Sequence, residues 1–149
     1  MVSSDTFVRD TLYFLKNDLL TNITDPLVGV RDSKSSFIMT SYPQRPVQYP
    51  LITIKPTNFT ANRSAMQSNN MDMQMIIEVR VWARNQKEKD QLFELVFSRL
   101  RKIQFATNGT QSNNLHDFKQ SSAVDVDEDG DGTPKSRVME VVYKFYDFT

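Results

Sequence analysis

The stretch MDMQMIIEVRVWAR, residues 71–84, decides the fold class because apolar side chains recur in it at every second position. That period of two is the period of a β-strand, whose successive side chains point to opposite faces of a sheet. One face of the predicted strand carries Met71, Met73, Met75, Ile77, Val79, Val81 and Ala83. The other face carries Asp72, Gln74, Glu78, Arg80 and Arg84, with Ile76 and Trp82 as apolar exceptions. A strand this long is expected to extend beyond the body of the domain at one end.

The residues that follow, 86–104, change to the period of an α-helix. Leu92, Val96, Leu100 and Ile103 fall on one stripe, which Phe93 and Phe97 widen until it is broad enough to cover a sheet face. The basic residues of this helix alternate with acidic ones, which predicts a solvated face. The basic residues are Lys87, Lys89, Arg99, Arg101 and Lys102, and the acidic ones are Glu88, Asp90 and Glu94.

The rest of the chain supplies a second helix and further strands. Residues 5–20 form an amphipathic helix, residues 37–42 and 51–55 two short strands, and the alternating RVMEVVYKFYDF the last strand. Residues 121–126 are a candidate short strand. The prediction is one α+β domain over residues 1–149, in the order α-β-β-β-α-β-β. Two helices cover one face of a mixed or antiparallel sheet of about four to five strands. Long loops are expected at about 56–70 and 105–136, because these segments offer little to bury.

Composition excludes several classes of protein. The chain has no cysteine, so disulfides, thiol catalysis and cysteine zinc sites are excluded. The start MVSSDTFVRD lacks the features of a signal peptide, and no apolar run reaches membrane-spanning length, so we expect a cytoplasmic protein without a membrane partner. Net charge is zero, but it is unevenly distributed. Residues 31–63 are basic and residues 125–131 acidic, and opposite charges on distant segments suit a protein that meets copies of itself.

The acidic stretch DVDEDGDG raises the question of a calcium site. Asp125, Asp127 and Asp129 followed by Gly130 match the front half of a calcium loop. The carboxylate that closes the coordination shell is missing, because position 12 is Ser136 in this register and Val138 in the register that starts at Asp127. Aspartate and glycine also favour turns, and DEDGDGTPKS connects two candidate strands. We therefore expect a hairpin tip and assign no metal site.

No group of residues predicts catalysis or a cofactor. His116, the one histidine, neighbours Asp117, but adjacent residues on a strand point to opposite faces and cannot orient each other. Nucleophile elbows, phosphate-binding glycine loops and HExxH motifs are lacking. Trp82, Tyr143 and Phe145 could in principle stack on bases, but Tyr143 and Phe145 share the apolar face of the last strand. Core packing accounts for them better than sequence-specific nucleic-acid recognition, and we predict a protein that is not an enzyme.

The element order and four segments resemble one family, the tail-completion or tail-terminator proteins of long-tailed bacteriophages and related viruses. The segments are TFVRDTLYFLKNDLL, SYPQRPVQYPLITI, IIEVRVWARNQKEKDQLFELVFSRLRK and VMEVVYKFYDF. The resemblance implies a virion protein that forms a ring, typically of six subunits, after assembly in the host cytoplasm. Such a ring caps the head-proximal end of the tail tube, stops its polymerisation and docks on the head connector. Its partners would be itself, the tail tube protein and a connector or neck protein.

Two other classes remain open on the sequence. A head-completion or connector adaptor of the neck would have a similar size but usually assembles in twelvefold rings. A small enzyme or nucleic-acid-binding domain would be monomeric or dimeric and would be stabilised by its ligand. For a ring, two contacts are expected: the basic 31–63 region against the acidic 125–131 segment, and sheet extension at the end of the 71–84 strand.

Overall fold

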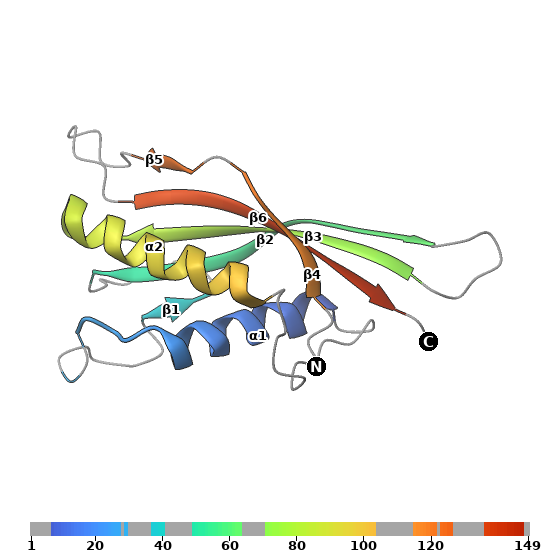
Figure 1. The fold of residues 1–149 in the computed structure, drawn as a ribbon, viewed down its shortest axis with the longest axis horizontal. Coiled ribbons are helices and arrows are strands. Elements are labelled where there is room, and N and C mark those ends of the chain that lie inside the picture. The colour runs from blue at the N-terminus through green and yellow to red at the C-terminus, as the bar shows by residue number, and fades with distance from the viewer. Residues whose placement is uncertain are drawn as a thin grey trace.

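The computed structural model describes residues 7–27, 29, 37–40, 49–63, 71–103, 115–121, 123–126 and 136–147. Two helices and six strands follow one another along this chain (Figure 1). They are α1 (Phe7–Asn22), β1 (Ile38–Met39), β2 (Leu51–Arg63), β3 (Met71–Trp82), α2 (Gln86–Ile103), β4 (Leu115–Gln120), β5 (Val124–Val126) and β6 (Ser136–Asp147). The predicted α+β fold with a mixed sheet is confirmed.

The six strands form one sheet in the order β1-β2-β3-β6-β4, and β5 pairs with β6 beside β4. β1 runs parallel to β2, and every other pair is antiparallel. β3 lies at the centre and pairs over its whole length with β2 on one side and β6 on the other. The long alternating stretch of the sequence is therefore the strand around which the sheet is built.

Both helices cover the same face of the sheet, as Figure 1 shows. The alternation predicted for residues 71–84 sets this face, because Met73, Met75, Ile77, Val79 and Val81 are all buried in the core. The strand register is fixed by such a pattern, since a slip of one residue would turn the apolar side chains to solvent. The helices contribute Leu15, Leu19, Leu92, Val96 and Leu100 to the same cluster, and β6 contributes Met139, Val141 and Tyr143.

The predicted loop at 56–70 is wrong for residues 56–63, because β2 continues through them to Arg63. From Lys55 to Ala61 each side chain is exposed, so apolar burial does not hold this part of the strand. The backbone ladder with β3 holds it instead, and a bulge between Pro56 and Asn58 accommodates the proline, which has no N–H to donate. Residues 64–70 lie outside the described part of the chain.

The predicted loop at 105–136 is corrected in the same way. It contains β4, which pairs with β6 through a bulge between His116 and Lys119, and β5, which falls inside the candidate strand at 121–126. The predicted strand at 37–42 is shorter than expected, since β1 is confined to Ile38–Met39. Pairing with a neighbouring strand, which a single segment does not reveal, decides where each of these strands begins and ends.

β2, β3 and β6 project together beyond the two helices at one end of the molecule (Figure 1). Arg63, Met71 and Asp147 lie at this end, because Arg63 pairs with Met71 and Met71 with Asp147. The expectation that the 71–84 strand extends beyond the body of the domain is confirmed. We call the projecting part of β2, β3 and β6 the sheet arm.

Candidate interaction surfaces

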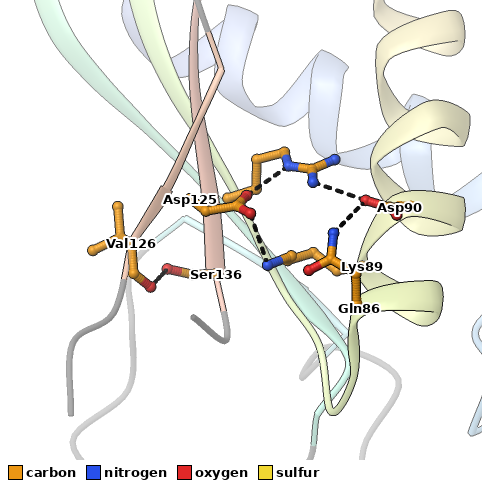
Figure 2. Close-up of polar contacts among 7 residues, drawn as sticks. Gln86, Lys89, Asp90, Asp125, Val126 and Ser136 are labelled. Carbon is orange, nitrogen blue, oxygen red and sulfur yellow. Dashed lines mark hydrogen bonds and ion pairs between the residues drawn. The ribbon is translucent and has the colours of Figure 1, made fainter. Parts of the chain in front are cut away.

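Four charged side chains from α2, β5 and β6 form the densest polar contact in the described part of the chain, which we call the ionic cluster: Lys89, Asp90, Asp125 and Arg137. Figure 2 shows Asp125 on the strand side of this cluster, facing Lys89 and Asp90 on α2. One carboxylate oxygen of Asp125 accepts from Arg137 Nε at 2.8 Å, and the other lies 3.2 Å from Lys89 Nζ. Arg137 also donates to Asp90 at 2.8 Å. The cluster thus joins the short strand β5 to both β6 and α2.

The ionic cluster joins a fully buried lysine to a carboxylate that is partly exposed to solvent. The Lys89 side chain is 0% exposed, whereas that of Asp125 is 34% exposed. The hydrogen bond from Arg137, with the further contact of Lys89, lowers the pKa of Asp125 despite partial burial of its carboxylate. The Arg137 guanidinium also lies 5.0 Å from the centre of the Phe93 ring, which supports it from the side of α2. Asp125 is therefore held as a carboxylate between two cations.

This geometry bears on the calcium hypothesis. Asp125, the first oxygen ligand in the better calcium register, belongs to strand β5 and is bound by two cations. β5 ends at Val126 and β6 begins at Ser136, and the two pair antiparallel, so the prediction that DEDGDGTPKS connects two strands is confirmed. Residues 127–135 lie outside the described residues. Among those that are described, no group of three histidine or acidic side chains could hold a metal ion.

Sequence reasoning missed the ionic cluster because it placed Lys89 on a solvated face. The structure corrects this: Lys89 is fully buried, and Arg99 donates two hydrogen bonds to Asp18 on α1. A signal for Lys89 is present in the sequence, since it stands three residues before Leu92 and seven before Val96, on the apolar stripe of the helix. Asp125, which forms an ion pair with Lys89, is distant from it in the sequence, and no sequence pattern indicated their contact.

The prediction of sheet extension at the end of the 71–84 strand is wrong. The 71–84 strand has no open edge, because β3 is paired on both sides along its whole length. Within the described residues, the outer edges of the sheet are formed by β1 and the rest of β2 on one side, and by β4 and β5 on the other. β1 pairs only with Ile52 and Thr53 of β2, and β4 is the last strand on the opposite side of the sheet. The two edges therefore face away from each other.

The edge of β2 nearest the body carries features that oppose pairing with another strand. Lys55 is charged, Pro56 cannot donate, and the bulge interrupts the ladder. The Asn58 side chain accepts from the Phe59 N–H at 2.7 Å, which occupies that donor within the strand itself. These features end at Phe59, whose ring is 42% exposed. The outer part of the edge, residues 60–63, is thus the part of β2 best suited to contact another chain.

Two of the three aromatic residues considered for base stacking, Trp82 and Tyr143, are engaged inside the protein. Trp82 is buried, stacks on Tyr49 with 5.9 Å between ring centres, and has the Arg80 guanidinium 5.2 Å from its own ring. Tyr143 is fully buried and donates from its hydroxyl to the Leu100 carbonyl at 2.7 Å, so its assignment to the core is confirmed. The side chain of Phe145 lies outside the described residues.

The remaining sequence candidates are only partly within the described residues. His116 and Asp117 are adjacent on β4, and their side chains lie outside the described residues. Of the basic 31–63 region, Arg31, Lys34 and Arg45 lie outside the described residues, whereas Lys55 lies 3.9 Å from Glu78 on β3. The contact between the basic 31–63 region and the acidic 125–131 segment stays a prediction. Asp125 is not available for it, because Lys89 and Arg137 already bind its carboxylate.

No helix in the described part of the chain combines the length and the apolar character needed to cross a membrane. No protein-family model matches the sequence, and a search of curated proteins finds no match.

Proposed function

We propose that this protein is a structural component of a virion that forms a ring, caps the head-proximal end of a tail tube and joins it to the head connector. In this role the ring ends polymerisation of the tube by covering its last layer of subunits. The proposal starts from the resemblance to tail-terminator proteins in element order and in the four segments quoted above. Its partners are other copies of the same chain, the tail tube protein and a connector or neck protein.

The arrangement of the two open sheet edges is the observation that supports this proposal best. The outer part of β2 and the whole of β4 lie on opposite sides of the same sheet. A contact between β2 of one copy and β4 of the next joins two different surfaces, and so it is heterologous. Repeated contacts of this kind close into a ring when the rotation between neighbours divides a full turn. A dimer with twofold symmetry would instead need one surface that matches itself.

The sheet arm is suited to such a contact because it projects beyond the helices (Figure 1). Exposed strand edges bind other strands through backbone hydrogen bonds. The proline, the bulge and Lys55 near the body oppose pairing there, and so they confine the proposed contact to residues 60–63. Phe59 lies beside this edge and offers an apolar surface that a neighbour would cover.

The native mass of the purified protein, measured together with negative-stain images of the same sample, tests the proposal. We expect rings, with six subunits as the expected number. Rings of twelve would favour a connector adaptor of the neck over a tail terminator. A monomer that also fails to form rings when mixed with assembled tail tubes would contradict the proposal.

A further inference from the structure

β5 is attached to the body of the protein mainly through polar contacts. It is three residues long, and its residues Val124 and Asp125 are exposed, with the Val124 side chain 56% exposed. It pairs with β6 alone, opposite Ser136, Arg137 and Val138. Because apolar burial is the main force that holds an element in place, β5 depends unusually on the ion pairs of Asp125. It is therefore an element that can leave while the core stays intact.

The surface beneath β5 is built to receive a carboxylate. Lys89 Nζ and Arg137 Nε approach different oxygens of the same carboxyl group, at 3.2 Å and 2.8 Å. Lys89 is fully buried, and Arg137 is fixed by Asp90 and lies against Phe93. When the carboxylate leaves, the buried Lys89 side chain loses this ion pair, and breaking an ion pair at a buried group by removing one partner is unfavourable. The site therefore favours refilling by another carboxylate over remaining empty.

The β6 backbone beside Lys89 and Arg137 restricts the conformation of a peptide that could replace β5. β5 binds as an extended strand antiparallel to β6, with Asp125 directly opposite Arg137. A peptide that replaces β5 and keeps both the ion pairs and the strand pairing would be extended in the same way, with its acidic side chain at the position of Asp125. The flanking residues of β5, Val124 and Val126, show that β-branched neighbours fit there.

The tether of β5 argues against an exchange of β5 between copies. Ser121 is bound to β6 in both directions: its N–H donates to the Glu140 carbonyl at 2.9 Å, and its side-chain oxygen accepts from the Glu140 N–H at 3.2 Å. Only two residues separate this anchor from Val124, so β5 can lift from β6 but cannot reach a distant copy. The replacement must come from another protein.

We propose that Lys89, Arg137 and the adjoining edge of β6 form a binding site for an extended acidic segment of a partner protein, and that β5 occupies this site in the isolated chain. The partner segment has an aspartate or glutamate between two β-branched residues. Binding displaces β5 and leaves the core unchanged. The site lies on β6 and α2, away from residues 60–63 of β2, and so this proposal does not depend on the ring.

The carboxylate site is tested with the full-length Asp125→Ala variant and acetate as the probe. Acetate should raise the thermal midpoint of the variant above its value in chloride at the same ionic strength, because a ligand that binds the native state stabilises it. The wild-type protein, whose site is filled, and the double variant Asp125→Ala with Lys89→Met should respond much less. Equal responses of Asp125→Ala and wild type would overturn the proposal. If Asp125→Ala does not fold, Asp125→Asn is compared with wild type in the same way.

Binding of an extended peptide to β6 in place of β5 is tested with the peptide SSAVDV, which has the sequence of residues 121–126. Its binding to Asp125→Ala is followed by NMR shifts of the amides of β6. The peptide should bind roughly tenfold more tightly than the same peptide with asparagine for aspartate, because hydrogen bonds to a charged group are the stronger ones. It should bind wild type more weakly, since β5 competes for the site. Equal binding of the two peptides, or no binding to a folded variant, would refute the strand-binding site.

Discussion

Arg99 on α2 donates two hydrogen bonds of 2.7 Å to the carboxylate of Asp18 on α1. The two residues are 81 positions apart in the sequence, and their contact is the ion pair that joins the two helices within the described residues. Both donors of one guanidinium edge are used, which is the strongest geometry for this pair. The hydrogen bond to Asp18 raises the pKa of Arg99. Burial raises the pKa of Tyr143, and the negative charge of Asp18 adds to this. Asp18 therefore connects α1 to α2.

Replacing Arg99 by methionine should lower the free energy of unfolding by about 1–2 kcal/mol. Two charge-assisted hydrogen bonds are lost, but the site is partly exposed and solvent screens part of the effect. Urea unfolding followed by circular dichroism measures the change. Arg9→Gln is the matched control, because the Arg9 side chain is 65% exposed in its ion pair with Asp10, and the substitution should change the free energy of unfolding by less than about 0.5 kcal/mol. Equal effects of the two variants would contradict this account.

Tyr143→Phe should destabilise the protein by about 1–2 kcal/mol near neutral pH, because the buried Leu100 carbonyl loses its donor. A pH dependence also follows. Burial raises the pKa of Tyr143 well above its usual value near 10, so its contribution is complete below the unfolded pKa and is lost as pH rises. The difference between wild type and variant should therefore shrink in alkaline solution. Tyr13→Phe is the control, since the Tyr13 side chain is 55% exposed and should tolerate the change.

Asp125→Asn should flatten the loss of stability in acid. The pKa of Asp125 is lowered in the folded protein, first by Arg137, so its contribution is present above the unfolded value near 3.9 and is lost as pH falls through the folded value. Wild type should thus be more stable than the variant at pH 6, and the two should converge towards pH 2. Denaturant unfolding at several pH values measures this. A difference that is independent of pH would show that the carboxylate charge does not hold β5.

Phe59→Lys should weaken self-association if the sheet arm forms the ring contact. Covering a phenylalanine that is 42% exposed releases apolar surface from water, whereas a lysine would have to be desolvated. We expect association to weaken by roughly tenfold or more, measured as the concentration at which rings dissociate. Tyr13→Lys removes an aromatic residue from α1 that is 55% exposed, and it should leave rings intact. Intact rings in the Phe59 variant would exclude this part of the arm as the contact.

The sequence predicted best the elements whose apolar pattern is long. The alternation through residues 71–84 and the helical stripe at Leu92, Val96 and Leu100 gave the central strand, the second helix and the face that joins them. Such a pattern indicates, within one segment of the sequence, which face of the element will be buried. The outer half of β2 and the whole of β4 were predicted as loops, because a polar strand buries too little to show an apolar pattern.

The candidate surfaces, too, could be predicted from the sequence only in part. Sequence alone indicated that Asp125 lies next to a hairpin connection and that this chain lacks a complete calcium loop, because both depend on spacing. Only the tertiary structure showed that Lys89 and Arg137 both contact Asp125, that β3 is paired on both sides, and that β2 and β4 contribute to the outer edges of the sheet. An amphipathic pattern determines which face of an element is buried. It does not determine which distant element covers that face, and ion pairs and sheet edges depend on that second choice.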